Sequence, residues 1–209
     1  MRIVRQEVFL EHITPSAALL IERAGRTCYK SEDRITADSA AKFIKMLLER
    51  GHESVIEHAY ASFRVICDRG VSHEFVRHRL FSYSQESTRY CNYAQEKYGE
   101  EIAVIEPPGM NSTARVLWAR SVHEAQLSYK GMLGQGCKPE IARSVLPNCL
   151  KTELVATANF REWRHFLRLR TSPKAHPQMR EIAKDIGRIL LHECPEVFDD
   201  MSAEIEDAG

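Results

Sequence analysis

The chain lacks long apolar runs, an excess of charge of either sign and closely spaced pairs of cysteines. No stretch of its 209 residues approaches the roughly 18 to 20 apolar residues needed to span a bilayer. Its net charge is zero, which disfavours a protein that coats nucleic acid, because such proteins carry a basic excess. The six cysteines include no Cys-x-x-Cys pair, which disfavours a zinc knuckle or a redox dithiol. We therefore expect a globular protein with neither a membrane nor a nucleic-acid partner.

The first residues also lack the features of a secretion signal. Residues 1–10 alternate charged and apolar side chains and contain no continuous apolar core. Together with the scattered cysteines, which we expect to be reduced thiols, this pattern predicts a cytoplasmic protein. The length suits one hydrophobic core, so we expect residues 1–209 to form a single domain.

Lysine is scarce where positive charge is concentrated. The chain has nine Lys against twenty Arg, and from Arg64 to Tyr90 it has five Arg and no Lys. Arginine binds phosphate and carboxylate through two parallel hydrogen bonds, which lysine cannot do. Residues 77–89 hold three guanidinium groups, one imidazole and several hydroxyls. Local positive charge on a neutral chain predicts a site for a small anionic, oxygen-rich ligand.

The sequence has no standard glycine loop for phosphates and no zinc motif. The glycines at 131, 134 and 136 follow a predicted helix, in the wrong order for a dinucleotide fingerprint. The histidines at 52 and 58 are six positions apart, whereas metalloprotease histidines lie at i and i+4. We therefore expect no metal, and any nucleotide must be bound without these loops.

Hydrophobic periodicity predicts an α+β fold, in which helices flank a mostly antiparallel sheet. Caps are predicted at Thr14 followed by Pro15, at Ser112 or Thr113, and at Asn159. The predicted helices cover residues 14–26, 40–48, 71–80, 112–133, 139–147, 159–170 and 178–194. The predicted strands cover residues 3–10, 59–67 and 150–158.

Helical spacing separates the basic residues into different faces. On a helix, Arg77 and Arg79 diverge by about 200°, so they would serve two ligands rather than one. A second basic face, at i, i+4 and i+7, comprises Arg161, His165 and Arg168. Arg170 falls on the opposite side of that helix. The alternative is that both basic segments are simply solvated helix ends.

The motif formed by Arg77, His78 and Arg79, followed by seven residues and Ser87, resembles the signature of flavin-dependent thymidylate synthases. Members of that family use FAD to methylate dUMP. Further segments resemble family motifs in the same order: residues 51–54 with 57–58, 141–143 before 146–147, 159–161 and 169–170. The resemblance implies an α+β homotetramer, with sites assembled from several subunits.

The resemblance also implies roles for individual residues. The flavin would be bound by Ser54, Arg77, His78, Arg79, Gln85, Asn159, Phe160, Arg161 and His165, with His52 near its ring. The nucleotide would be bound by Glu74, Phe75, Val76, Arg77, Gln85, Glu86, Ser87, Thr88, Arg89, Arg143 and Arg170. Arg170 would stabilise the ionised N3 of uracil and so act catalytically. Arg89 and Arg143 would lie near the phosphate.

The implied reaction transfers a methylene carbon from methylenetetrahydrofolate to dUMP, with hydride from flavin that NADPH has reduced. It uses no enzyme thiol. Three positions depart from the family pattern: His165 replaces a frequent asparagine, Glu74 stands where glutamine can occur, and Glu86 brings a carboxylate to the nucleotide. We expect Glu86 to contribute its main chain only.

Two other functions compete with this interpretation. In the first, Cys149 would be the nucleophile of a flavin-free thymidylate synthase, an unrelated enzyme whose active-site cysteine also follows a proline, as Cys149 follows Pro147. A buried structural thiol is the simpler explanation of Cys149. Alternatively, the arginine clusters could bind RNA, which the zero net charge disfavours.

Overall fold

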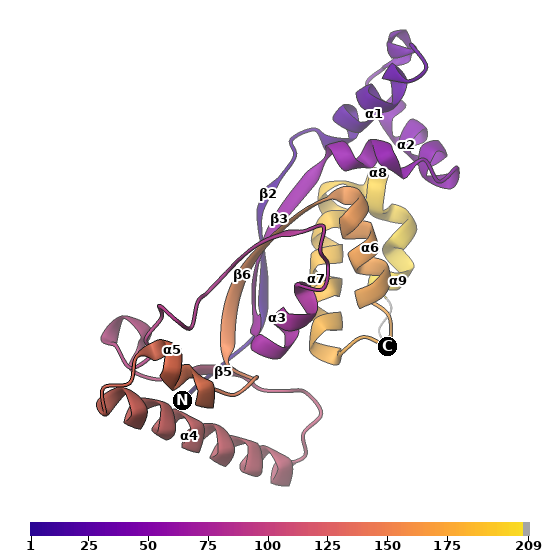
Figure 1. Cartoon of the computed structure of the whole chain (residues 1–209). Coiled ribbons are helices and arrows are strands. Elements are labelled where there is room, and N and C mark those ends of the chain that lie inside the picture. The colour runs from indigo at the N-terminus through magenta and orange to yellow at the C-terminus, as the bar shows by residue number, and fades with distance from the viewer. Residues whose placement is uncertain (207–209) are drawn as a thin grey trace. The chain divides into compact units, whose positions relative to one another are not determined.

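The computed structural model describes residues 1–206 and has an α+β fold (Figure 1). A four-stranded antiparallel sheet has the order β2-β3-β6-β4, and a separate pair joins β1 to β5. The predicted fold class is thus confirmed. The strands are β1 (Arg2–Val4), β2 (Glu7–Ile13), β3 (Tyr60–Asp68), β4 (Ser82–Gln85), β5 (Ala103–Ile105) and β6 (Lys151–Asn159).

Nine α-helices and five 3-10 helices are formed by residues 1–206. The α-helices are α1 (Ala17–Thr27), α2 (Ser39–Glu49), α3 (Arg69–Phe75), α4 (Ser112–Gly134), α5 (Pro139–Ala142), α6 (Phe160–Arg170), α7 (Pro177–Glu193), α8 (Pro195–Phe198) and α9 (Ser202–Glu206). The 3-10 helices are η1 (Glu32–Arg34), η2 (Glu53–His58), η3 (Glu96–Tyr98), η4 (Arg143–Val145) and η5 (Asp199–Met201). Within the part of the chain described, no helix has both the length and the apolar character needed to cross a bilayer.

The chain forms two compact units. The first unit comprises Met1–Glu7, Val65–Arg77 and Ser84–Leu154, and the second comprises Val8–Arg64, His78–Tyr83 and the chain from Val155 onward. Strands β2, β3, β4 and β6 each contribute residues to both units. The single domain expected from chain length stays a prediction.

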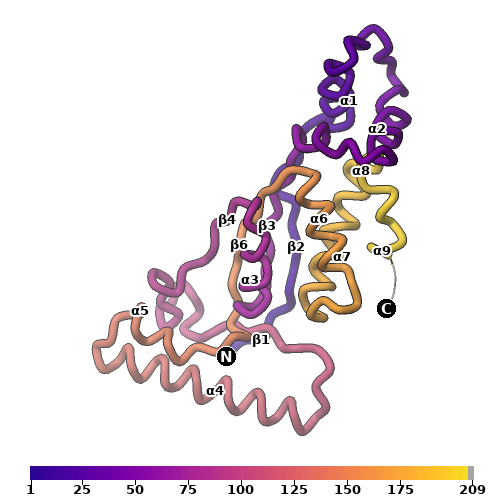
Figure 2. Tube along the Cα trace, turned by 45° about the vertical axis from the view of Figure 1, so that its right-hand side comes forward, coloured from indigo at the N-terminus to yellow at the C-terminus, as the bar shows by residue number. Residues whose placement is uncertain are grey.

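The first unit contains the parallel pair of strands and the long helix α4. Strand β1 pairs with β5 in the register Arg2 to Ala103 and Val4 to Ile105. Figure 2 shows α5 lying alongside α4. The buried core of this unit consists of Tyr93, Ile102, Val104, Val122, Tyr129, Ala142 and Leu150. The long helix predicted at 112–133 is confirmed, and the single strand predicted at 3–10 is replaced by β1 and β2, because β1 pairs with β5 and β2 joins the larger sheet.

Trp163 of α6 lies at the centre of the second unit. Its side chain is fully buried, and its indole Nε1 donates to the main-chain oxygen of Ala61 at 3.0 Å. The rings of Phe63 and Phe81 meet it edge-on at centroid distances of 5.0 and 4.5 Å. These contacts hold α6 against β3 by apolar burial and aromatic geometry.

Of the helix N-caps predicted from sequence, the structure confirms one and places the others elsewhere. Asn159 caps α6 as predicted, because its side-chain oxygen accepts from the main-chain nitrogen of Glu162 at 2.9 Å. The cap of α4 is Asn111 rather than Ser112 or Thr113. The predicted cap at Thr14 is wrong, because the Thr14 hydroxyl hydrogen-bonds the main chain of Tyr60, and α1 starts at Ala17.

Helix α3 ends earlier than its pattern predicts. The predicted helix covers residues 71–80, whereas α3 stops at Phe75. Beyond that end, the main-chain oxygen of His78 accepts from Phe81 N at 3.3 Å and from the Tyr83 hydroxyl at 3.2 Å. Turn bonds therefore replace the helical ladder, and the predicted helical divergence of Arg77 and Arg79 does not apply.

Candidate active site

The residues expected to bind ligands fall into two groups. The second unit holds those expected at the flavin: His52, Ser54, His78, Arg79, Asn159, Phe160, Arg161 and His165, together with Arg170. The first unit holds those expected at the nucleotide: residues 74–77, residues 85–89 and Arg143. Arg77 and Gln85, which were expected to touch both ligands, belong to the first unit.

His78 is the buried centre of the group in the second unit. Only 5 % of its surface is exposed, and its ring contacts the rings of Phe81 and Phe166. The Nε of Arg170 donates to His78 Nε2 at 3.0 Å, while His78 Nδ1 lies 3.8 Å from a carboxylate oxygen of Glu162. Since Nε2 accepts a hydrogen bond, the proton of the neutral imidazole belongs on Nδ1.

The electrostatics of His78 agree with this neutral form. The pKa of His78 is lowered from 6.5 to about 4, mainly by burial and also by the neighbouring positive groups of Arg170 and His165. Burial raises the pKa of Glu162 above its ordinary value, although His165 opposes that rise. His78 is therefore a neutral hydrogen-bond acceptor for Arg170 near pH 7.

The same residues also form the only candidate metal cluster within residues 1–206. Potential ligand atoms of His78, Glu162 and His165 all lie within 4.8 Å of one another. A guanidinium group, however, already occupies His78 Nε2 and would repel a cation. The expectation of no metal stays a prediction, and the Arg170 contact supports it.

Folding stability should depend on pH through His78. Between pH 6.5 and about 4, the unfolded chain binds a proton on this imidazole and the folded chain does not. The free energy of unfolding should therefore decrease as pH falls through this window, by up to about 3 kcal/mol. Denaturant unfolding of the wild type and of His78→Gln at several pH values measures this slope, which should be shallower in the variant. An equal slope in both proteins, or a His78 imidazole that titrates near pH 6.5 by NMR, would contradict the assignment.

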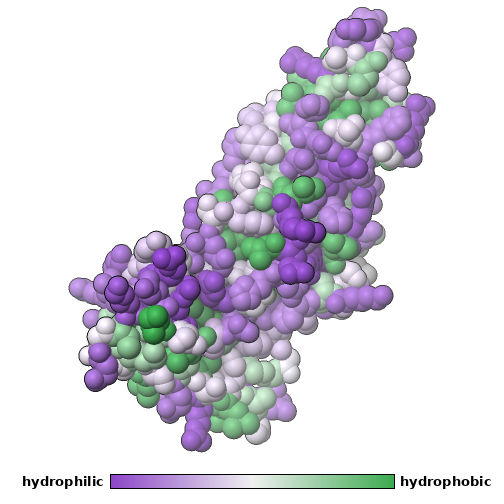
Figure 3. Space-filling model, viewed as in Figure 1, coloured by the Kyte–Doolittle hydropathy of each residue, from purple (hydrophilic) through white to green (hydrophobic). Residues whose placement is uncertain are grey.

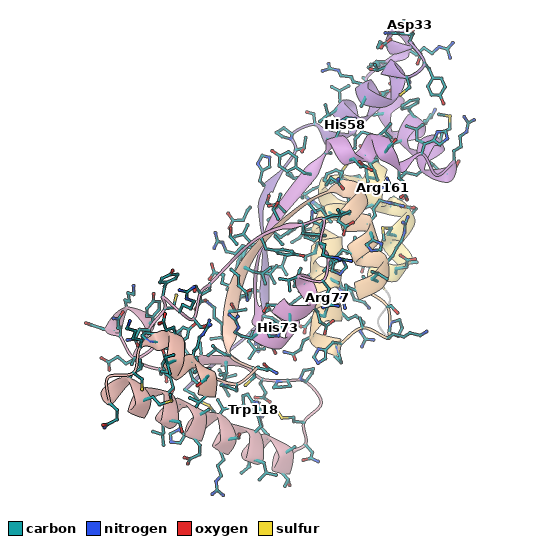
Figure 4. The ribbon with its side chains drawn as sticks, viewed as in Figure 1. Asp33, His58, His73, Arg77, Trp118 and Arg161 are labelled. Atoms are coloured by element: carbon teal, nitrogen blue, oxygen red, sulfur yellow. The ribbon has the colours of Figure 1, made fainter. Side chains whose placement is uncertain are left out.

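Two arginines of α6, Arg161 and Arg168, both contact the carboxylate of Glu53 at the start of η2. Arg161 Nη1 lies 2.6 Å from Glu57, and Arg161 Nε lies 3.5 Å from Glu53. Arg168 Nη2 lies 3.1 Å from the other oxygen of Glu53. The predicted common face of Arg161 and Arg168 is consistent with this shared contact, and Figure 4 shows Arg161 on α6. His165, between them in sequence, is exposed.

The remaining residues expected at the flavin differ in what they can offer. His52 and Ser54 are exposed, at and just inside the start of η2. The side-chain oxygen of Asn159 is engaged in capping α6, so only its amide NH2 can reach a ligand. Phe160 is fully buried against Phe198 and can present only its main chain to a cofactor.

In the first unit, Gln85 is fixed by two buried hydroxyls. Its Nε2 donates to Ser72 Oγ at 2.9 Å and to Thr152 Oγ1 at 3.1 Å. Both amide hydrogens are thus used, and the side-chain oxygen remains the group that can accept from a ligand. On α3, Phe75 is buried, Glu74 is half-buried, and the following residue, Val76, is exposed.

The carboxylate of Glu86 is engaged within the first unit. One oxygen accepts from the Tyr93 hydroxyl at 2.7 Å, and the other lies 2.9 Å from Lys151 Nζ. The main-chain nitrogen of Glu86 donates to the oxygen of Glu153 at 2.8 Å. This arrangement fits the expectation that Glu86 offers its main chain to the nucleotide. The sequence pattern missed Lys151 and Tyr93, since nothing local marks them as partners of position 86.

Four arginines of the expected site carry charge that no carboxylate offsets. Arg77, Arg79, Arg89 and Arg143 are exposed, and none forms an ion pair with any side chain of residues 1–206. Figure 4 shows Arg77 beyond the end of α3. Some arginines elsewhere, such as Arg26, Arg115 and Arg164, are paired with carboxylates, whereas others, such as Arg23 and Arg50, form no ion pair within residues 1–206. Unpaired guanidinium groups are suited to binding an anionic ligand.

Thr88 and Ser87 organise the turn that carries Arg89. Arg143 Nη1 donates to Thr88 Oγ1 at 3.1 Å, and the main-chain nitrogen of Arg89 donates to Ser87 Oγ at 3.3 Å. Thr88 is buried, whereas Ser87 is half-buried. The turn therefore brings Arg143 to the segment of Arg89 through a hydroxyl rather than through a carboxylate.

Cys149 is poorly suited to act as a nucleophile. Its side chain is half-buried, and burial raises the pKa of the thiol above its ordinary value. The reactive form of cysteine is the thiolate, which a raised pKa disfavours at neutral pH. The structure therefore weighs against a thiol mechanism.

Comparisons with known proteins identify the family of this chain. Residues 9–196 match the family model of the thymidylate synthase complementing protein. A flavin-dependent thymidylate synthase of Mycolicibacterium vanbaalenii is 34% identical over 203 residues, covering 88% of this chain and 79% of the relative. Another, from Mycobacterium bovis, is 36% identical and covers 87% of this chain and 78% of the relative. The chain belongs to the flavin-dependent thymidylate synthase family.

A solved structure supports the fold of this family member. The UMP/dUMP methylase PolB from Streptomyces cacaoi, bound with 5-Br dUMP, superposes with a TM-score of 0.83. The match covers 97% of both chains at 24% sequence identity. At this identity the likeness establishes the fold, and the family assignment rests on the sequence relatives.

Proposed function

We propose that this flavin-dependent thymidylate synthase methylates dUMP to dTMP, with FAD as its cofactor. One observation carries the proposal beyond family membership: Arg77, Arg79, Arg89 and Arg143 remain without carboxylate partners among residues 1–206 of a chain with zero net charge. Phosphate groups of a nucleotide and a dinucleotide would supply the missing negative charge.

The donors of the second unit fit a dinucleotide cofactor. Arg79, Ser54 and His165 are exposed and offer N–H or O–H donors of the kind that phosphate oxygens and hydroxyls accept. We propose that these side chains, the NH2 of Asn159 and the main chain of Phe160 hold FAD, with His52 near the ring. When bound, the reduced flavin supplies the hydride that completes the methyl group.

The donors of the first unit fit the nucleotide. We propose that Arg89 and Arg143 bind the phosphate, and that the oxygen of Gln85 accepts from the base or sugar. Residues 74–77 and 86–88 would complete the surroundings of dUMP mainly through their main chain and hydroxyls.

Arg170 is proposed as the catalytic residue. Its Nε donates to neutral His78 at 3.0 Å, and this contact fixes the orientation of the guanidinium group that we propose contacts the uracil. A fixed cation next to N3 stabilises the ionised base and polarises the ring for attack on the carbon donor. Because His78 is neutral, it does not compete with Arg170 for the anionic base.

The remaining parts of the reaction are proposed from the family. Methylenetetrahydrofolate would donate the carbon, and NADPH would reduce the flavin. A homotetramer is also proposed, and exposed apolar side chains on α4 support it: Val116, Leu117 and Leu127 are 68%, 64% and 50% exposed. Figure 3 shows apolar residues at the surface in this region. Exposed leucine and valine on a long helix are suited to packing against another subunit.

The proposal is tested with the purified full-length protein. It should be yellow, or become so with added FAD, with an absorption maximum at about 450 nm. With dUMP, methylenetetrahydrofolate and NADPH, it should form dTMP. A folded protein that neither binds FAD nor methylates dUMP would contradict the proposal.

Two further measurements, dTMP formation by a cysteine variant and RNA binding, separate this mechanism from the two competing functions. Cys149→Ser should retain dTMP formation within a few-fold, because the proposed mechanism uses no thiol and burial raises the pKa of the Cys149 thiol. Complete loss of turnover in a folded Cys149→Ser protein with normal flavin content would indicate a thiol nucleophile. Tight RNA binding that weakens steeply with salt would instead favour a nucleic-acid module.

A further inference from the structure

Glu86 presents an electrostatic problem at the proposed nucleotide site. It lies between Gln85 and Ser87, in the segment proposed to hold dUMP, and an ionised carboxylate there would repel the phosphate. Two unit charges about 10 Å apart, at an effective dielectric constant of about 20, change an affinity roughly tenfold. The side chain must therefore be neutralised if this segment is to bind an anion.

The neutralising charge comes from Lys151 on β6. Lys151 Nζ lies 2.9 Å from Glu86 Oε2, and the two side chains are only 22% and 17% exposed. Partial burial keeps this pair from being screened by solvent as a surface pair would be. Burial alone would lower the pKa of Lys151, but Glu86 and then Glu153 raise it overall, so Lys151 stays positively charged.

Two further contacts fix the geometry of the carboxylate. The Tyr93 hydroxyl donates to the other oxygen of Glu86 at 2.7 Å, so both oxygens are engaged. The main-chain nitrogen of Glu86 donates to Glu153 of β6 at 2.8 Å, two residues beyond Lys151 on the same strand. The start of the segment that leads to Arg89 is thereby fastened to β6 through both main chain and side chain.

We propose that Lys151, assisted by Tyr93, is a positioning residue that cancels the charge of Glu86 and holds its carboxylate against β6. This inference rests on the proposed binding of dUMP by residues 85–89. In consequence, the affinity of the enzyme for the anionic nucleotide depends on a lysine that need not touch the nucleotide. An ion pair that served only folding would leave nucleotide affinity unchanged once the protein is folded.

The test is a double-mutant cycle on the FAD-bound enzyme, with dUMP affinity and steady-state kinetics as readouts. Lys151→Met should raise the Kd and KM for dUMP about tenfold, with kcat within about threefold of wild type. In a Glu86→Gln background, the same Lys151→Met substitution should change dUMP affinity by less than about twofold, because the charge of Glu86 is gone and the other carboxylate near Lys151, that of Glu153 at 3.4 Å, is more exposed to solvent. Lys151→Arg should keep affinity near that of wild type.

Controls distinguish an electrostatic effect from a structural one. Lys45→Met removes a lysine from the exposed side of α2, outside both proposed ligand sites, and should leave the KM for dUMP unchanged. Thermal unfolding of each protein establishes that it is folded. If Lys151→Met does not fold, Lys151→Gln takes its place with the same expected values.

A failure of the proposed function can be distinguished from a failure of the proposed role of Lys151. A wild-type enzyme that does not bind dUMP would overturn the proposed function itself. A wild-type enzyme that binds dUMP, combined with unchanged affinity in Lys151→Met, would overturn only the role of Lys151. A loss of affinity that Glu86→Gln does not relieve would likewise overturn it, because it would show that Lys151 acts through packing rather than through the charge of Glu86.

Discussion

Arg170→Lys should retain flavin yet lose about 100- to 1000-fold in kcat/KM for dUMP, a loss of the size found when one preorganised donor to a developing charge is removed. The physical reason is the fork geometry of arginine. Its Nε donates to His78 at 3.0 Å, and the same rigid group would also make the proposed contact with the uracil. A lysine ammonium is a single point charge and cannot occupy both positions.

Flavin absorbance, dUMP affinity and single-turnover dTMP formation together separate the possible outcomes. Arg168→Lys is the matched control, because Arg168 lies on the same helix and pairs with Glu53 at an exposed position. It should change turnover by no more than a few-fold. If Arg170→Lys turned over like the wild type, the catalytic role of Arg170 would be refuted. If it lost its flavin, Arg170 would instead be a cofactor-binding residue.

Asp200→Ala should destabilise the folded protein by about 3 kcal/mol. Arg164 is only 2% exposed, and both terminal nitrogens of its guanidinium group lie 2.6 Å from the two oxygens of Asp200. The same group also donates to the main-chain oxygen of Val197, while its Nε is buried without a partner. Removing Asp200 therefore leaves the buried guanidinium group without its counter-ion.

Denaturant unfolding at neutral pH measures this loss. Asp199→Ala, at the exposed neighbouring position, should change stability by less than about 0.5 kcal/mol. Arg164→Met should cost less than Asp200→Ala, because a methionine fills the space without a buried charge and the half-exposed Asp200 returns to water. The reverse order of the two costs would refute this account of the pair.

The elements that could be predicted from sequence are those whose signal is local. The alternation in residues 150–158 predicted β6 to within a residue, and Asn159 capped α6 as its spacing from Glu162 indicated. Both depend on contacts between residues close in the chain. The fold class followed from the same periodicities.

The predictions that failed depended on distant partners. Thr14 looked like a helix cap, but its hydroxyl bonds Tyr60, 46 positions away. The pattern of residues 71–80 suggested a continuous helix, whereas the chain turns after Phe75. Nothing in that window reveals that His78 meets Arg170, 92 positions later, or that Glu86 meets Lys151, 65 positions later. The motif located the arginines, but it could not show which charges the protein already neutralises.

The shared contact of Glu53 with Arg161 and Arg168 has a consequence for cofactor exchange. Long side chains normally lose rotamer freedom when they order around a ligand. Here Arg161, although half-exposed, already contacts Glu53 and Glu57, so part of that entropic cost is met before any cofactor arrives. The carboxylates, however, would compete with flavin phosphates for the same guanidinium group. FAD would therefore bind and dissociate as its phosphates replace, or are replaced by, the carboxylates of Glu53 and Glu57 around Arg161, whose side chain stays in place.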